Sequence, residues 1–285
     1  MPTLPFDVIQ LYRSQTFRML PGMRLQDVDQ AVAFVKERGF VYFWPISGIT
    51  LPSLWVATAG DRPVADEHDD PGHVTWGWKD SLLGQRRWYY AKILRKKATM
   101  ISMEVAPFFY ALTENYGAYD EDYLTQYEQG RLSVETKQVY EALLKDGPLD
   151  TVALRRATHM TSQGSESRFN RALADLQADF KITPVAVTQA GAWHYAFAYD
   201  VTARYYPEIP ESAHLISEQA ARQKLAELYL CSVGAAQAGD LAKLFHWKPA
   251  EVQSTLDGLV QSGIIKPNLE IENRSGDWFI ISDII

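Results

Sequence analysis

The sequence predicts an α+β protein, mostly helical, in which small helical units are repeated and each ends in a β-hairpin. Residues 166–180 carry apolar side chains at the spacing of one helical face: Phe169, Ala172, Leu173, Leu176 and Phe180. Alternating apolar residues on both sides of a turn at 189–192 then indicate two strands. Residues 217–281 repeat the same order of helices and hairpin. We therefore expect at least two copies of one small fold.

The first copy begins after Gly130. Ser133 and Asp150 precede two apolar segments and are expected to cap two helices, because their side-chain oxygens can accept hydrogen bonds from free first-turn amides. Ser165 is expected to cap the third helix in the same way. Pro184 cannot continue that helix, so the chain enters the hairpin there.

The second copy follows a stiff connector, Tyr206-Pro-Glu-Ile-Pro. Ser217 caps its first helix, and its third helix runs from Pro249, a favoured first residue, to Gly263, a favoured stop. Three helices followed by a hairpin form a winged helix, a fold that places its third helix in the major groove and uses the hairpin as a wing.

Two cations of the helix at 166–180 lie opposite its apolar stripe. Arg168 and Arg171 are therefore expected to face solvent or DNA phosphates. The alternative for Arg171 is a local ion pair with Asp175, four residues further along the helix.

The N-terminal part is predicted to be an arm up to Gly22, a helix over Leu25–Arg38, a strand at Phe40–Phe43 and a helix at Leu51–Ala57. These assignments give three domains: an N-terminal helical or winged-helix-like domain (1–130) and two winged-helix modules (131–205 and 206–285).

An acidic loop covers Asp61–His73 and contains Asp66, Glu67, His68, Asp69 and Asp70. Such residues can bind cations, but their spacing matches no ligand pattern and Pro71-Gly72 interrupts it. We expect a solvated loop, no bound metal and no cofactor.

The next segment, residues 78–102, mixes aromatic rings with cations. Residues Trp78–Lys97 carry seven Lys and Arg residues against a single carboxylate, Asp80. Rings interleaved with cations suit a phosphate backbone and unpaired bases. A half-buried helix with a lysine-rich solvent face is an equally good interpretation. Under the first interpretation the DNA-binding residues here are Arg86, Arg87, Arg95, Lys96 and Lys97.

The composition restricts the function classes. The net charge of −7 argues mildly against a nucleic-acid binder, but a local basic face can coexist with an acidic whole. Cys231 is the single cysteine, which excludes an internal disulfide and suits a reducing cytoplasm. No apolar run reaches the length of a bilayer span and the first residues lack a signal peptide's pattern, so we expect no membrane association.

Several stretches, taken in order, resemble the tandem winged-helix DNA glycosylases of the AlkZ/YcaQ type, which release alkylated and crosslinked bases. The resemblance rests on Trp76-Gly-Trp78-Lys-Asp-Ser81-Leu-Leu83, on Phe197-Ala-Tyr199-Asp200-Val with Arg204 and Pro207, and on the segment from Asp240 to Ile265. It implies a winged-helix fold, binding of double-stranded or damaged DNA, and a cytoplasmic or nucleoid-associated protein.

The chain departs from the family at the position of the catalytic motif. The family has a Gln-x-Gln or Gln-x-Asp motif, whereas the matching stretch here, Phe43-Trp44-Pro45-Ile46-Ser47, has neither glutamine nor carboxylate. Trp44, Pro45 and Ile46 instead form an apolar patch that could act as a wedge in distorted DNA. Asp80 is the one nearby carboxylate and so the one weak catalytic candidate, although capping a following helix explains it more simply.

Three hypotheses remain open. The chain is a DNA-binding relative of these glycosylases without their catalytic motif, an active glycosylase that uses other residues, or a winged-helix regulatory or protein-interaction module.

Overall fold

One order of elements, helix–strand–helix–helix–hairpin, occurs three times in the computed structural model, which describes residues 3–115 and 117–284. We call the copies the first, second and third units. In each unit the short strand pairs with the last strand, so that the last strand lies in the middle: the sheet orders are β2-β4-β3, β5-β7-β6 and β8-β10-β9. The third sheet gains β1 at the edge of β9.

The first unit, at residues 28–101, is the copy that the sequence did not reveal. Its elements are α2 (Val28–Arg38), β2 (Phe40–Tyr42), α3 (Leu54–Ala59), α4 (Val74–Ser81), β3 (Tyr89–Lys92) and β4 (Ala98–Ile101). Asp27 caps α2, and Gly39 ends it with a φ of +80°. A β-carbon at Gly39 would lie 2.7 Å from Leu228 of the third unit, so this position needs glycine both for its backbone angle and for space.

Two sequence interpretations in this unit need correction. The helix expected at Leu51–Ala57 begins at Leu54, because Ser53 supplies the cap. The helix considered for residues 78–102 ends at Ser81, and the chain then forms the β3–β4 hairpin. Asp80 and Ser81 therefore close α4 and do not cap a following helix.

The second unit follows the sequence prediction closely. It contains α7 (Val134–Asp146), β5 (Leu149–Asp150), α8 (Thr151–Ala157), α9 (Glu166–Ala178), β6 (Ile182–Thr188) and β7 (Ala196–Val201). Ser133 and Asp150 cap α7 and α8 as expected. Ser165 does not cap α9, because it is the last residue of a 3-10 turn and its hydroxyl donates to the carbonyl of Ser162.

The third unit closes the chain. It contains α12 (Glu218–Val233), β8 (Ala235–Ala236), α13 (Ala238–Phe245), α14 (Pro249–Gln261), β9 (Ile265–Ile271) and β10 (Arg274–Ile281). Leu256 and Leu259 are buried with the apolar side chains of α12 and α13, as the stripe predicted.

Short elements join the units. The N-terminal arm contains β1 (Thr3–Leu4), which pairs with β9, and α1 (Phe6–Thr16), which packs on α12. The connectors contain α5 (Ala106–Tyr110), α6 (Asp122–Glu128), α10 (Thr202–Tyr205) and α11 (Glu208–Ala213). Short 3-10 turns lie at Pro21–Met23, Pro71–His73, Leu94–Lys96 (η3), Gln163–Ser165 and Ser282–Ile284.

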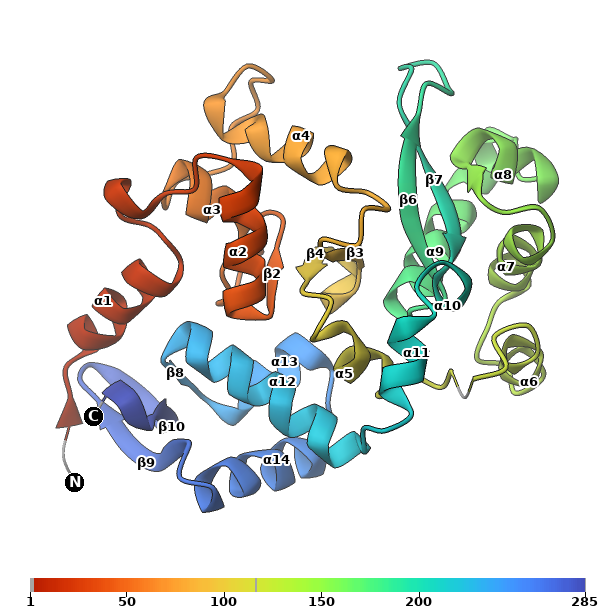
Figure 1. The fold of residues 1–285 in the computed structure, drawn as a ribbon. Helices are drawn as coiled ribbons and strands as arrows, with labels where there is room; N and C mark the ends of the chain where they lie inside the picture. The colour runs from red at the N-terminus through yellow and green to blue at the C-terminus, as the bar shows by residue number, and fades with distance from the viewer. Residues whose placement is uncertain (1–2, 116, 285) are drawn as a thin grey trace.

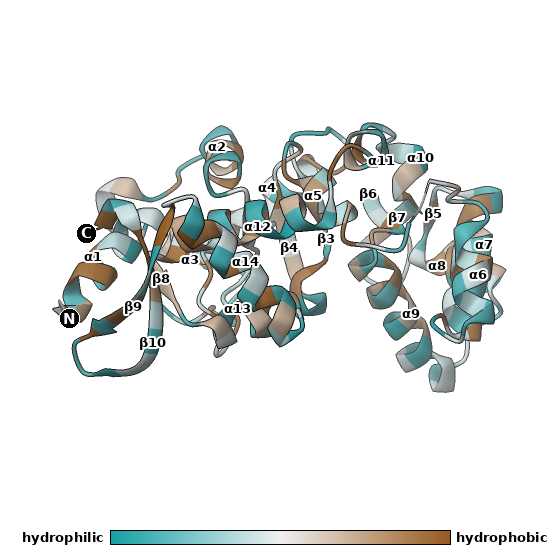
Figure 2. Ribbon diagram, turned by 90° about the horizontal axis from the view of Figure 1, so that it is seen from below, coloured by the Kyte–Doolittle hydropathy of each residue, from teal (hydrophilic) through white to brown (hydrophobic). Residues whose placement is uncertain are grey.

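The first and third units lie side by side. The second unit lies at the other end of the molecule, with its β6–β7 hairpin nearest the first unit and its helices beyond the hairpin (Figure 1). Apolar residues gather where elements face one another, whereas the outer sides of α6 and α7 are largely hydrophilic (Figure 2). The first and third units share one core, the first unit has a further core around Trp78 and Trp88, and the second unit has a core of its own.

Phe180 connects the second unit to the shared core, although the sequence places it on one helical face with Leu173 and Leu176 and so predicts that it packs with them. Leu173 and Leu176 do so, but Phe180 follows the end of α9 with a φ of +55°. Its ring stacks on Tyr89 of the first unit at 4.7 Å with an interplanar angle of 9°. The positive φ turns the ring out of the helical stripe and into the joint between units.

Candidate nucleic-acid interface

A buried lysine lies where the first and second units meet. Lys79 stands on α4 with 1% of its surface exposed. Five aromatic rings surround its Nζ atom at 4.5–5.9 Å from their centroids: Phe43, Trp76, Tyr90, Tyr195 and Phe197. We call this arrangement the Lys79 cage. Tyr195 and Phe197 come from the wing of the second unit, so the cage exists only where the two units touch.

Two polar groups complete the cage. The Nζ atom of Lys79 lies 2.6 Å from Oδ1 of Asp80 and donates to the Tyr195 hydroxyl at 3.1 Å. The Tyr195 hydroxyl in turn donates to Oδ1 of Asp80 at 3.0 Å. An amine, a carboxylate and a phenol are therefore in mutual hydrogen-bonding contact.

Burial sets the electrostatics of this triangle. Loss of hydration lowers the pKa of Lys79, and the hydrogen bond and charge of Asp80 oppose this shift only in part. Burial, with the Asp80 charge adding to it, raises the pKa of Tyr195, so the phenol keeps its proton. The side chain of Asp80 is 25% exposed, which opens the triangle to solvent on one side.

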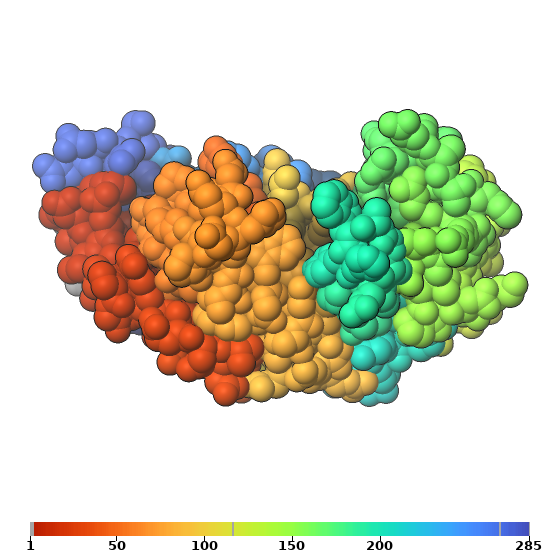
Figure 3. All heavy atoms as spheres, turned by 90° about the horizontal axis from the view of Figure 1, so that it is seen from above, coloured from red at the N-terminus to blue at the C-terminus, as the bar shows by residue number. Residues whose placement is uncertain are grey.

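The rim of the cage is aromatic and exposed. Within the described chain the exposed large aromatic residues are Trp76, Trp193 and Tyr195, with 38%, 90% and 39% of their surface accessible. Trp76 lies on α4, and the other two lie at the wing tip. Viewed from above, the wing stands between the first unit and the helices of the second (Figure 3). Trp76 and Tyr195 both contact Lys79, so exposed rings from two units meet at the cage, as at an interaction surface.

The predicted wedge residues lie beside this rim but do not all protrude. Trp44 is half-buried, with its ring 5.2 Å from Phe43 and 5.6 Å from Trp76. Ile46 is half-buried on the shared core, and Pro45 alone is exposed. The apolar patch therefore supports the Lys79 cage through Trp44, and Trp76 is the more exposed ring.

The predicted basic residues of the first unit are split between the two ends of β3. Arg86 and Arg87 precede the strand, whereas Arg95, Lys96 and Lys97 follow it in the turn that contains η3. A four-residue strand separates the two groups by about 13 Å. They do not form one continuous cluster.

Most of these cations already have partners. Arg86 pairs with Glu208, Arg87 with Asp29, Lys96 with Asp175 and Arg168 with Glu135. Arg95 donates to the carbonyl of Lys243 and contacts His246. In the part of the chain that the structure describes, Lys97 and Arg171 have no ion pair. The sequence offered a local ion pair between Arg171 and Asp175 as an alternative. In the described part of the chain Asp175 pairs with Lys96 instead.

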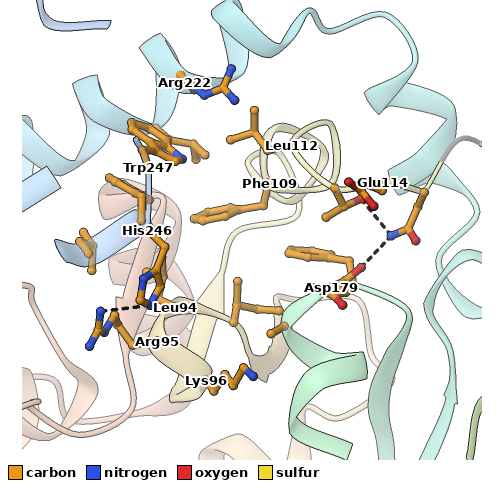
Figure 4. Close-up of a pocket in the computed structure, with 18 of the residues that line it drawn as sticks. Leu94, Arg95, Lys96, Phe109, Leu112, Glu114, Asp179, Arg222, His246 and Trp247 are labelled. Carbon is orange, nitrogen blue, oxygen red and sulfur yellow. Dashed lines mark hydrogen bonds between the residues drawn. The ribbon is translucent and has the colours of Figure 1, made fainter. Parts of the chain in front are cut away.

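Away from the Lys79 cage, a hollow of about 620 Å³ lies where the three units meet (Figure 4). Phe109, Leu112 and Trp247 supply apolar walls, while Glu114 and Asp179 face the same space as Arg95, Lys96 and Arg222. Because carboxylates and cations are mixed here, the hollow is not a phosphate site, and the Lys79 cage is the stronger candidate.

The acidic loop does not gather metal ligands. Asp70 pairs with Arg62 at 2.6 Å and accepts from the amide of Gly72 at 2.7 Å, so its carboxylate closes the loop. Over residues 3–115 and 117–284, no three histidine, cysteine or acidic side chains group as metal ligands would. Nor does any helix there combine the length and apolar character that a membrane span needs.

Lys79 and Tyr195 were missed from the sequence. The signal that could have found them is the aromatic alternation Trp76, Trp78 on one segment and Trp193, Tyr195, Phe197 on the other. A lysine inside an aromatic-rich helix has no solvent face to occupy and must find a partner.

Comparison with known proteins gives a family and a similar fold. Residues 25–246 match a protein family described as AlkZ related. A search of curated proteins found no match. Among solved structures, the DNA glycosylase AlkZ of Streptomyces sahachiroi is similar with a TM-score of 0.59 and 12% identity, covering 99% of this chain and 71% of that one.

Proposed function

Because this chain belongs to the AlkZ-related family, matched over residues 25–246, we propose that it recognises damaged or distorted double-stranded DNA. The observation that carries the proposal is the Lys79 cage at the junction of two units, where the partly exposed rings of Trp76 and Tyr195 contact Lys79. Trp193 is exposed on the same wing segment, two residues before Tyr195. Exposed rings can stack on unpaired bases, which damaged duplexes offer and intact duplexes do not.

The three units supply the frame for this recognition. We propose that each is a winged helix, with domain limits near 1–130, 131–205 and 206–285, and that α9 and the β6–β7 wing of the second unit face the duplex. Arg171 and Lys97, which have no ion pair among the described residues, are the cations most available to phosphates. Arg168, Arg86, Arg87, Arg95 and Lys96 would first have to leave their present partners. Binding of this kind associates the protein with the nucleoid.

Base excision by the family's usual chemistry is not part of this proposal. Phe43, Trp44 and Pro45 offer no carboxylate or amide that could orient water at a glycosidic bond. The alternative, an active glycosylase, rests on Asp80, whose carboxylate is partly exposed beside a cation. A carboxylate placed in this way can stabilise a developing oxocarbenium ion.

One experiment separates these functions. The purified full chain is incubated with plain, alkylated and crosslinked duplexes, and both binding and base release are measured. We expect tighter binding to the damaged duplexes and no release of bases. Base release that disappears in Asp80→Asn would establish the glycosylase instead. Equal and negligible binding to all three duplexes would leave a regulatory or protein-interaction module.

A further inference from the structure

We propose that Lys79 is an amine nucleophile that forms an imine with the aldehyde of an abasic site in DNA. This inference rests on the proposed DNA recognition and names its substrate class: a strand in which one deoxyribose has lost its base. Ring-opened deoxyribose presents an aldehyde at C1′. A lysine held away from water is the side chain that reacts with such a carbonyl.

The environment of Lys79 favours this chemistry over a purely structural role. Five rings exclude water from its Nζ atom, and desolvation lowers the pKa of the amine. Among the residues that the structure describes, Asp80 is the one carboxylate paired with Lys79, whereas a lysine that only balances charge would gain from more than one. The amine therefore has one carboxylate base beside it, at 2.6 Å, in addition to the Tyr195 hydroxyl.

The ring of Tyr195 covers Lys79 from the side of the wing. Tyr195 belongs to the wing segment before β7, is 39% exposed and is held on this side by its hydroxyl contacts to Lys79 and Asp80. Contact of the wing with DNA can displace this ring. Trp193, 90% exposed on the same segment, can then stack in the gap that the missing base leaves.

The reaction balances with these groups and water. Asp80 accepts a proton from the Lys79 ammonium, and the free amine adds to C1′. The nitrogen passes one of its own protons to the C1′ oxygen and Asp80 returns the other, so that the oxygen leaves as water and an iminium ion remains. Asp80 can next remove a proton from C2′. The electron pair of that bond forms a C2′–C3′ double bond, and the C3′–oxygen bond breaks, so that the downstream strand leaves with a 5′-phosphate. Water then hydrolyses the imine and restores the amine.

The roles are distinct. Lys79 is the catalytic nucleophile and Asp80 the proton carrier, since both touch the reacting atoms. Tyr195 is a positioning residue, because its hydroxyl donates to the carboxylate and its ring covers the amine.

Borohydride trapping tests the proposal. The full chain is mixed with a duplex that carries one abasic site, and sodium cyanoborohydride is added to reduce any imine. We expect a covalent protein–DNA adduct, with the modified peptide containing Lys79. The trapped fraction should fall at least tenfold in Lys79→Met and also in Lys79→Arg, which keeps charge and length but not the nucleophile. Lys266→Met, an exposed lysine of β9, is the matched control and should trap like the wild type.

Strand cleavage without the reductant adds an independent measurement. Asp80→Asn should slow cleavage more than it reduces trapping, because the C2′ proton then lacks its acceptor. The trapping rate should also rise with pH and level off below the pKa of an ordinary lysine, which a structural lysine would not produce.

The outcomes are separable. No adduct from a protein that binds the same duplex in a gel overturns the proposal and leaves DNA recognition standing. An adduct that persists in Lys79→Arg assigns the nucleophile to another amine and also overturns it. A protein that neither binds nor traps overturns both this proposal and the function on which it rests.

Discussion

Lys79 and Asp80 are neighbours in the chain, and their charged groups lie 2.6 Å apart at the junction of two units, with one partner buried and the other a quarter exposed. Removing only the carboxylate leaves a buried cation without its partner, which costs about 3–5 kcal/mol when both groups are fully buried. Because Asp80 reaches solvent, we expect Asp80→Asn to lose about 1–3 kcal/mol of unfolding free energy.

A double-mutant cycle measured by urea unfolding checks this pair. Lys79→Met removes the cation and should recover part of the loss, so that the double variant is more stable than Asp80→Asn alone. Additive losses would mean that the two groups are not coupled.

The stacked rings of Tyr89 and Phe180, 4.7 Å apart, join the first and second units. Phe180→Ala should cost about 3–5 kcal/mol, as truncation of a buried ring does. Phe180→Leu keeps most of the apolar volume and should cost less than half as much. Thermal unfolding of both variants checks the order. A loss below about 1 kcal/mol for the alanine variant would show that the joint does not depend on this ring.

Because the side chain of Lys181 is buried, the free energy of unfolding should change with pH in the alkaline range. Burial lowers the pKa of Lys181 to about 8, although the charge of Asp179 opposes the shift, and its Nζ atom donates to Asn115 at 2.7 Å. Between pH 8 and the higher pKa of the unfolded chain, the unfolded state binds the extra proton, so the contribution of Lys181 to stability rises with pH. Below pH 8 the native state contains a charge that burial disfavours.

We therefore expect Lys181→Met to stabilise the protein at pH 7 by about 1–2 kcal/mol, part of the cost of the buried charge being offset by the lost hydrogen bond. The advantage should shrink as the pH approaches 10. Urea unfolding of both proteins at pH 7 and pH 10 gives the comparison, with Lys266→Met as the exposed control. A variant that is less stable at pH 7, or an advantage that does not change with pH, contradicts the assignment.

Unpaired cations should contribute more to DNA binding than paired ones. Arg171→Ala and Lys97→Ala should each weaken binding to every duplex sequence and lower the slope of log affinity against log salt by about one. Arg168→Ala should have a smaller effect, because Glu135 already binds that side chain. Fluorescence anisotropy across a salt series measures both quantities. Unchanged slopes for Arg171→Ala and Lys97→Ala would show that neither side chain contacts DNA phosphates.

The second and third units could be predicted from the sequence because their helices carry apolar stripes and because Ser133, Asp150 and Ser217 cap three of these helices. The first unit could not. Its α3 and α4 have six and eight residues, too short for a clear period, and long loops separate them from each other and from β2.

The candidate site was predicted only in part, for a reason of distance along the chain. Asp80 was found as an isolated carboxylate, but its partner Tyr195 stands 115 residues away. The basic residues were found by local composition, whereas their acidic partners Asp29, Glu208 and Asp175 come from three other helices, α2, α11 and α9. Local pattern gives the charge of a segment but not what neutralises it.

The most direct measurement compares two duplexes that differ at one position, where one carries a stable abasic analogue and the other an ordinary nucleotide. Anisotropy titrations of the full chain at the same salt concentration should give at least tenfold tighter binding to the abasic duplex, about 1.4 kcal/mol. Replacing Trp193 by alanine should remove most of this preference and leave binding to the intact duplex unchanged. Equal affinity for both duplexes, in the wild type and at every salt concentration, would contradict recognition of damaged DNA at the Lys79 cage.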